Sequence, residues 1–144
     1  MLFVFTVFAV GCKQEDGCTK FGSDNYNPDA VIDDGSCIPA RDKFLGDFRV
    51  TSDCFDNPYT ISISEEIDER EVIISTLSDT LSDIKGIVVL QDITIERQTV
   101  GIGISIEGAG TSISQDTIEL SYRIIDVRNG NEQTYDCFEE LVRQ

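Results

Sequence analysis

Side chains that offer oxygen ligands are concentrated between residues 24 and 34 of this 144-residue chain. They recur at spacings of one to four residues, and Asn27-Pro28 and Asp34-Gly35 predict turns that fold the segment back on itself. Calcium binds about six to eight oxygen atoms of carboxylates, amides and backbone carbonyls, although the register here is not that of an EF-hand. Two interpretations stay open: a spacer in which these side chains only cap turns, and a calcium site with the candidate ligands Asp24, Asn25, Asn27, Asp29, Asp33 and Asp34.

Five cysteines are the other chemically active residues. An odd number is awkward in an oxidising compartment, because one thiol has no partner. If Cys12 is modified, the other four can form two disulfides. We favour the pairs Cys18 with Cys37, which closes a short loop, and Cys54 with Cys137, which joins the first and last predicted strands. The rival is zinc held by all four thiolates, but the chain has no Cys-x-x-Cys pair from which such a site is usually built.

An uncharged apolar run, Met1–Gly11, begins the chain. A run of this length is too short to cross a bilayer, which needs about 20 apolar residues. It is typical of the apolar region of a secretory signal that ends in small residues before a cleavage site. The sequence therefore predicts a signal peptide over residues 1–11 and an exported protein.

The residues around Cys12 predict where the exported protein goes. Ala9-Val10-Gly11-Cys12 resembles a bacterial lipobox, which implies that Cys12 carries lipid such as palmitate and becomes the first mature residue. Lys13-Gln14-Glu15-Asp16 resembles the export signal of surface lipoproteins of the Bacteroidota, which implies lipid anchoring in the outer membrane with exposure at the cell surface. Residues 12–17 are then a lipidated, acidic linker. The alternatives are a periplasmic orientation, and a plain signal peptide followed by an ordinary thiol.

Residues 18–39 form a small acidic module without apolar periodicity of either kind. Such a segment cannot bury enough apolar surface to fold unaided, so a disulfide, a cation or both must hold it together. Gly17-Cys18-Thr19, Asn25-Tyr26-Asn27-Pro28-Asp29-Ala30 and Asp33-Asp34-Gly35-Ser36-Cys37 resemble a short repeat of secreted and surface proteins of marine Bacteroidota. Lys20 stands where that repeat usually has Asp, which removes one candidate ligand.

The charge balance excludes several classes of protein. Lys plus Arg is 11 and Asp plus Glu is 27, so the formal charge is −16, and there is no His. A surface for nucleic acid or anionic lipid needs clustered Lys and Arg, and a Ser-His triad needs an imidazole. Glu65/Glu66 and Glu139/Glu140 are adjacent pairs, so on strands the two members of each pair point to opposite faces. We therefore predict a protein that is not an enzyme and does not bind nucleic acid.

Alternation of apolar and polar residues with a period of two predicts strands through residues 42–144. Asn129-Gly130 predicts a type I′ hairpin, Gly108 and Gly110 predict a bulge, and Asp136–Arg143 is expected to add one helical turn at most. The predicted strands are centred on Phe48–Cys54, Tyr59–Ile63, Glu71–Leu77, Ile84–Leu90, Ile93–Ile95, Ile102–Ile106, Ile118–Ile124 and Tyr135–Cys137.

About eight strands in roughly 100 residues favour an all-β fold, an antiparallel up-and-down barrel, because closure removes the free edges of a sheet. Phe44-Leu45-Gly46-Asp47-Phe48, followed by these strands, resembles the lipocalin-like domains of Bacteroidota lipoproteins, with Phe48 in place of the usual Trp. The resemblance implies a barrel of the calycin type over residues 42–144. The alternative is a sandwich of two sheets.

Three roles are compatible with a lipid-anchored acidic barrel. We favour a non-catalytic structural or accessory interaction module whose partner is an outer-membrane protein, since acidic surface charge suits solvation or a basic partner. A second role is a lipocalin-like binder of a small apolar ligand, although inward residues, Ile102, Ile104 and Ile106 among them, are expected to fill a small interior. A third is a calcium-stabilised adhesion module.

Overall fold

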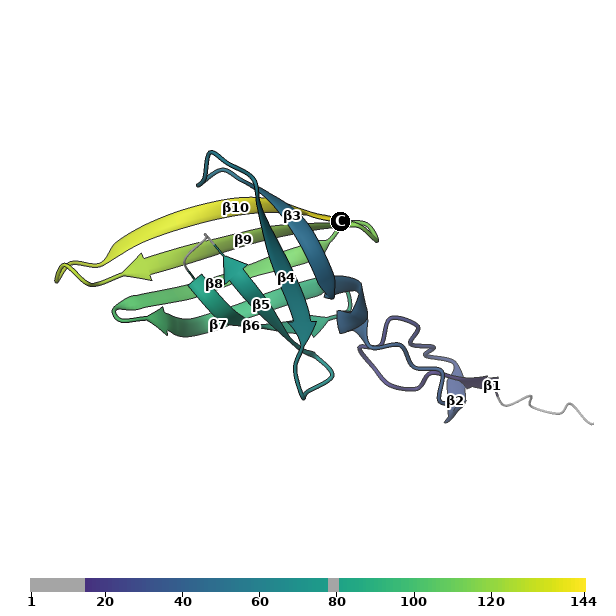
Figure 1. Ribbon diagram of the computed structural model, residues 1–144. Helices are drawn as coiled ribbons and strands as arrows, with labels where there is room; N and C mark the ends of the chain where they lie inside the picture. The colour runs from purple at the N-terminus through teal and green to yellow at the C-terminus, as the bar shows by residue number, and fades with distance from the viewer. Residues whose placement is uncertain (1–14, 78–80) are drawn as a thin grey trace, which may run out of the picture.

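Eight antiparallel strands form the body of the protein in this computed structural model, which describes residues 15–77 and 81–144 (Figure 1). Each strand pairs with the next one in the sequence, as is usual for strands joined by short connections. The strands are β3 (Gly46–Ser52), β4 (Tyr59–Glu65), β5 (Glu71–Leu77), β6 (Leu81–Val89), β7 (Asp92–Gly101), β8 (Ile104–Ser112), β9 (Thr117–Asp126) and β10 (Gln133–Arg143).

The sheet closes on itself because its last strand pairs with its first. β10 lies between β9 and β3, and Leu141 is opposite Ile118 on one side and opposite Val50 on the other. This arrangement confirms the predicted eight-stranded up-and-down barrel, and the alternative of a two-sheet sandwich is wrong. Closure satisfies backbone groups that would otherwise form free edges.

Apolar side chains fill the interior of the barrel. Successive side chains of a strand point to opposite faces of the sheet; in β9, for example, Leu120 is buried whereas Ser121 is exposed. Burying one large aliphatic or aromatic side chain contributes about 1.5–3 kcal/mol. The largest side chains that are less than 2 % exposed are Phe44, Phe48, Ile61, Ile74, Leu77, Ile84, Ile93, Ile95, Ile106, Ile118, Leu120 and Leu141.

One expected core residue lies outside the core. Ile102 is 95 % exposed, whereas Ile106 is fully buried. Ile102 falls between the end of β7 at Gly101 and the start of β8 at Ile104, so it occupies the tip of a hairpin rather than an inward strand position. The inward placement predicted for Ile102 is therefore wrong.

The C-terminal segment is a strand throughout, so Asp136–Arg143 adds no helical turn, which is within the expected limit of one. Cys137, Glu139 and Leu141 are buried, whereas Glu140 between them is exposed. A charged residue at an inward position obscures the alternation in the sequence. Pairing with β9 and β3 on both sides decides the conformation instead.

The bulge predicted at Gly108 and Gly110 is also wrong. Both glycines lie in regular register in β8, opposite Tyr122 and Leu120 of β9, and the register shifts lie in β7. A Cβ atom on Gly108 would lie 2.5 Å from the carbonyl oxygen of Ser121. Glycine is therefore needed there because two backbones approach closely.

The β9–β10 connection differs from the predicted type I′ turn. It spans residues 127–132, and within it Gly130 alone has a positive φ, of 78°. A type I′ turn requires positive φ at both central residues of a two-residue loop. The longer loop is held by the Asp126 carboxylate, which accepts hydrogen bonds from the backbone N–H of Arg128 at 2.9 Å and from its guanidinium at 2.6 Å.

A short 3-10 helix, η1 (Ala40–Phe44), closes one end of the barrel, with Phe44 fully buried. Arg143, near the end of β10, donates a hydrogen bond to the carbonyl oxygen of Lys43 at 2.7 Å. Its guanidinium lies over the Phe48 ring, 4.8 Å from the ring centre, within the range of a cation–π contact. Arg143 thereby joins η1 to the first and last strands.

The acidic module lies beyond η1, outside the barrel (Figure 1). Two short parallel strands, β1 (Glu15–Gly17) and β2 (Ala30–Asp33), form its only regular structure among the described residues. The predicted linker over residues 12–17 therefore contributes a strand to the module. Cys18 and Ser23 are its buried residues, and the other side chains are partly or fully exposed.

The opposite end of the barrel is splayed. The β7–β8 and β9–β10 hairpins extend well beyond β3 and β4 in Figure 1. Pairing shows the same feature: β10 continues to pair with β9 as far as Gln133, but its pairing with β3 stops at Glu139. Similarly, β7 pairs with β8 over most of its length but with β6 only over Asp92–Thr94.

Candidate functional sites

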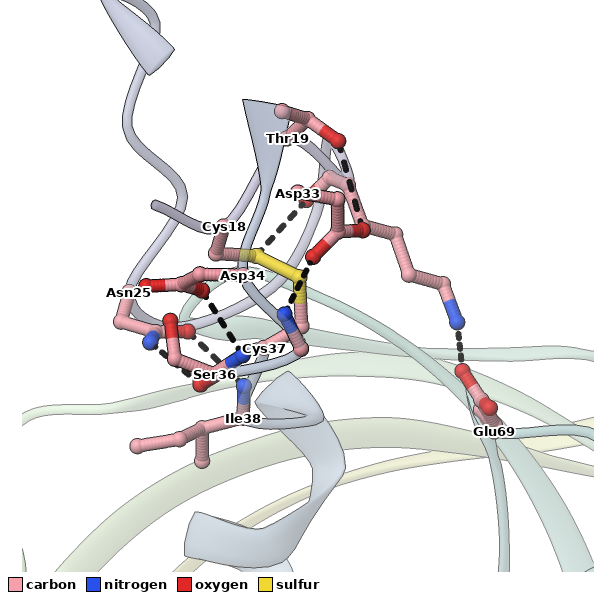
Figure 2. The surroundings of a disulfide bond; sticks show 11 residues. Cys18, Thr19, Asn25, Asp33, Asp34, Ser36, Cys37, Ile38 and Glu69 are labelled. Carbon is pink, nitrogen blue, oxygen red and sulfur yellow. Dashed lines mark hydrogen bonds and ion pairs between the residues drawn. A yellow bond between two sulfur atoms is a disulfide. The ribbon is translucent and has the colours of Figure 1, made fainter. Parts of the chain in front are cut away.

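The candidate calcium ligands lie in the acidic module, where backbone groups already bind several of their oxygen atoms (Figure 2). The Asn25 side chain bridges two points of the chain: its Nδ2 donates to the carbonyl oxygen of Ser36 at 2.6 Å, and its Oδ1 accepts from the backbone N–H of Ile38 at 2.8 Å. Asn25 therefore ties the middle of the module to its C-terminal end, a structural role for a short polar side chain.

Three further candidates cap turns. Oδ1 of Asn27 accepts from the N–H of Asp29 at 3.0 Å, Oδ1 of Asp33 from that of Gly35 at 2.8 Å, and Oδ1 of Asp34 from that of Ser36 at 2.9 Å. Each is an Asx turn, in which a side chain binds the backbone two residues ahead. Hydrogen bonds from Ser36 lower the pKa of the Asp34 carboxyl.

Two ion pairs connect the module to the barrel. Asp24 pairs with Lys43 of η1, and Lys20 pairs with Glu69 in the β4–β5 loop. Both pairs are partly exposed to solvent, so each contributes at most about 1 kcal/mol. Lys20, the residue that departs from the repeat pattern, therefore contacts the barrel.

The described residues do not bring three carboxylates of the module into one metal-sized group. The single group of three potential ligand atoms within 4.8 Å of one another is formed by Asp53, Cys54 and Cys137, and both sulfur atoms there are already bonded to each other. Figure 2 shows the Asp33 and Asp34 side chains directed at separate backbone groups. Calcium binding stays a prediction.

Both predicted disulfides are confirmed. Cys18 is bonded to Cys37, with Cα atoms 4.8 Å apart, and Cys54 to Cys137, with Cα atoms 5.6 Å apart. A zinc site built from the four thiolates is therefore wrong, because no thiolate remains in these pairs. Cys54 lies just past the end of β3 rather than within it, and its disulfide ties the β3–β4 loop to β10.

The predicted lipidation site lies outside the part of the chain that the structure describes. Cys12 and the signal peptide belong to residues 1–14, so lipid attachment and export stay predictions. Within residues 15–77 and 81–144, no helix has the length and apolarity needed to cross a bilayer.

The sequence considered Glu139 only as one of two adjacent carboxylates on opposite faces of a strand, and the structure buries it inside the barrel with its side chain fully inaccessible. Its Oε1 accepts hydrogen bonds from the hydroxyls of Tyr59 at 2.5 Å and Tyr122 at 2.6 Å. Oε2 is buried without a hydrogen-bond partner among the described residues. The sequence did contain a signal, because Glu139 has the same parity as Cys137 and Leu141, which face inward.

Burial raises the pKa of the Glu139 carboxyl, although the hydrogen bonds from Tyr122 and Tyr59 act in the opposite direction. Burial likewise raises the pKa of the Tyr122 hydroxyl, and the neighbouring Glu139 raises it further. A desolvated carboxyl favours its neutral form. The cluster is therefore a buried network of one carboxyl and two hydroxyls on the inner face of the sheet, with the carboxyl contributed by β10, the strand that closes the barrel.

A groove lies on the outer surface near the splayed end. It has a volume of about 460 Å³ and lies between the β3–β4 loop and the outer face of β8, β9 and β10, with Asp53, Glu107, Arg123, Asp136 and Phe138 among its lining residues. Arg123 and Asp136 face each other across β9 and β10, with Nε and Oδ1 2.6 Å apart, and this pair lowers the pKa of Asp136. Three carboxylates against one guanidinium make the groove acidic.

A second groove separates the module from the barrel. Its volume is about 210 Å³, and its lining includes Phe21, Ala40 and Val88. Phe21 is 75 % exposed and packs edge-to-face on Tyr26, with ring centres 5.6 Å apart. This groove is mostly apolar, whereas the one beside β10 is acidic.

Comparison with protein-family models, with curated proteins and with solved structures gives no match to this chain. Function is therefore inferred from the molecule itself: from the filled barrel, the disulfide-bonded module and the surface features at the two ends.

Proposed function

We propose that the protein is a lipid-anchored surface lipoprotein of the outer membrane that acts as a non-catalytic accessory interaction module. The observation that carries the proposal is the barrel interior, which is occupied by large apolar side chains such as Phe48 and Ile106 at 0 % exposure. A filled interior leaves the outer surface as the place where a partner binds. Eight-stranded barrels of this size have just enough room for such packing.

The arrangement of the two regions supports a tethered role. β1 begins at Glu15 at the end of the module that faces away from the barrel (Figure 1). A lipid on Cys12 is therefore followed within a few residues by a compact spacer and then by the barrel. One acyl chain gives only weak membrane binding, so stable anchoring needs more than one, as in a bacterial lipoprotein.

The acidic surface favours a partner that is a protein with a basic surface, or one bound through divalent cations, over nucleic acid. The formal charge of −16 steers encounters towards basic surfaces and away from phosphate backbones. This property separates an accessory protein from a free-standing nucleic-acid or lipid binder.

Sizing of the native protein tests the proposal. The whole chain is extracted from its own membrane in mild detergent, separated by size, and the peak is identified by mass spectrometry. We expect it to migrate within a larger assembly, and the Cys12→Ala variant to leave the membrane fraction. Migration of the wild-type chain as a bare monomer contradicts the accessory role, and membrane retention of the variant contradicts the anchor.

A second candidate function is binding of a small apolar ligand. The groove between the module and the barrel favours it, because Phe21, Ala40 and Val88 line a space of about 210 Å³, which is small for a ligand pocket. Denaturation of the natively purified protein followed by mass spectrometry of small molecules tests this function. Release of one compound in equal molar amount supports it, and none after native purification contradicts it.

A further inference from the structure

The splayed end of the barrel leaves one side of a strand unpaired. From Gln133 to Asp136, β10 pairs with β9 but, within the described residues, with no strand on its other side. All residues of this stretch are exposed. We refer to residues 133–136 as the β10 edge.

The direction of the free backbone groups follows from the neighbouring contacts. The carbonyl oxygen of Phe138 accepts from the N–H of Asp53 at 3.1 Å, and the Phe138 N–H donates to Oδ1 of Asp53 at 2.7 Å, so both groups point away from β9. Alternate residues of an antiparallel strand direct their N–H and C=O groups to the same side. The N–H and C=O of Thr134 and the N–H of Asp136 therefore point to the open side of β10. The Asp136 carbonyl oxygen is already in contact with Sγ of Cys54, 3.5 Å away, which marks where the open stretch ends.

The other free edge of the splayed end is protected, and the β10 edge is not. β7 contains two register shifts, and the Gln98 side chain fills the gap between β7 and β6: it bonds the N–H and C=O of Lys85 of β6 at 2.9 and 2.8 Å and donates to the Glu96 carbonyl oxygen of β7 at 3.2 Å. Bulges and covered backbone are the usual ways in which proteins prevent strand addition. β10, in contrast, runs from Gln133 to Val142 in unbroken register.

The surroundings of the β10 edge define the chemistry of an added strand. On its inner face Tyr135 is 50 % exposed, and on its outer face Phe138 is 44 % exposed. The acidic groove with Glu107 and Asp136 adjoins the outer face. A strand added here would place every second side chain over that acidic groove and the others beside Tyr135.

From these observations we propose that the β10 edge binds an extended segment of a partner protein in which basic residues alternate with apolar ones. Main-chain hydrogen bonds to the N–H and C=O of Thr134 and to the N–H of Asp136 hold the segment, and lysine or arginine side chains pair with the acidic groove. The charge of −16 opposes addition of a second copy of this chain. This inference rests on the proposed function and specifies the partner's chemistry.

A synthetic strand tests the edge directly. The probe is a capped decapeptide of alternating lysine and valine with a fluorescent label, titrated with the whole chain, and its counterpart has glutamate in place of lysine. We expect Thr134→Pro, which removes a backbone donor at an edge position that tolerates proline, to weaken lysine–valine binding at least tenfold. Thr134→Val, which keeps the donor, should bind within twofold of the wild type.

A second pair of variants tests the groove in case the proline variant does not fold. Glu107→Lys changes the charge inside the groove, and Glu140→Lys makes the same change on β10 outside it. We expect at least a fivefold loss of peptide binding in the first variant and less than a twofold loss in the second. Equal losses, equal binding of the glutamate–valine peptide, or unchanged binding by Thr134→Pro would overturn the proposal.

The native assembly separates failure of this inference from failure of the proposed function. We expect membrane-extracted wild-type chain to run in a larger assembly and the Thr134→Pro chain to run free. If both run in the assembly, the accessory role holds and the edge inference is wrong. If the wild type runs as a monomer, the accessory role itself fails, and if it runs as a homodimer that Thr134→Pro dissolves, the occupant is a second copy and the basic segment is wrong.

Discussion

The module (residues 15–39) and the barrel (residues 46–143) are held together by different interactions, although each contains one disulfide. In the module, Cys18 is the one buried apolar residue among those described, and Phe21 and Val31 are 75 % and 65 % exposed. In the barrel, a continuous apolar core lies inside a closed sheet. In a short segment, side-chain-to-backbone hydrogen bonds and a disulfide can therefore replace an apolar core. The longer barrel depends on its core.

Loss of core packing should have the largest effect, and only in the barrel. Phe48→Ala removes a fully buried ring and its contact with Arg143, so we expect the free energy of unfolding to fall by about 3–5 kcal/mol. Chemical denaturation followed by circular dichroism measures this change. Phe21→Ala is the matched control, with an expected change below about 0.5 kcal/mol. Comparable losses in the two variants would remove the distinction between the regions.

Removal of one disulfide should lower the stability of the region that contains it and leave the stability of the other region unchanged. With Cys18 and Cys37 both changed to Ser, we expect the module to lose about 3 kcal/mol of local stability, from loop-closure entropy over a separation of 19 residues. The barrel should keep its denaturation midpoint. Amide exchange at Ile38, whose N–H binds Asn25, reports on the module. The double Ser variant of Cys54 and Cys137 should instead lower the denaturation midpoint of the barrel. If the barrel midpoint fell in both double variants, the two regions would unfold as one unit.

The buried carboxyl should make the stability of the barrel depend on pH. Because burial raises the pKa of Glu139, the folded protein holds this proton more tightly than the unfolded chain. Its full stability is therefore present below the unfolded pKa of about 4.3 and declines as the pH rises through the folded pKa. We expect Glu139→Gln to be more stable than the wild type at pH 7 and equal to it near pH 4. Thermal unfolding from pH 4 to 9 measures this, with exposed Glu140→Gln as the control; parallel curves for wild type and Glu139→Gln would contradict it.

Calcium should have the smallest effect, and only on the module. At a free concentration equal to its dissociation constant, a bound ion adds about 0.4 kcal/mol. We expect calcium to slow amide exchange at Ser36, beside Asp34, and chelator to reverse the change, while the barrel midpoint stays constant. The Asp33→Asn/Asp34→Asn variant should lose the response. If exchange is the same with calcium, magnesium and chelator, the turn-capping spacer is the correct interpretation.

The difference between the regions also explains which parts of the structure could be predicted. In the barrel, a period of two over many residues reports which face is buried, and β5 begins and ends at the predicted residues Glu71 and Leu77. The module has no such period, yet its cysteine spacing indicated its disulfide. Predictions were wrong where a residue type has both a local and a tertiary explanation. Gly108, for example, suggested a bulge, but glycine is needed there because the backbone lies close to β9.

The sequence by itself determined the all-β class, the approximate strand count, an even set of four cysteines available for disulfides and the acidic character of the chain, because alternation, cysteine number and charge are properties of the chain. Tertiary structure alone decided that Glu139 lies inside the barrel, that the candidate calcium ligands bind backbone groups, which cysteines pair, and that one side of β10 stays open. These features depend on how far each strand overlaps its neighbour and on which side-chain oxygen accepts a hydrogen bond from which backbone N–H. Strand overlap and hydrogen-bond partners are set by the folding of the whole chain, so no local sequence pattern encodes them.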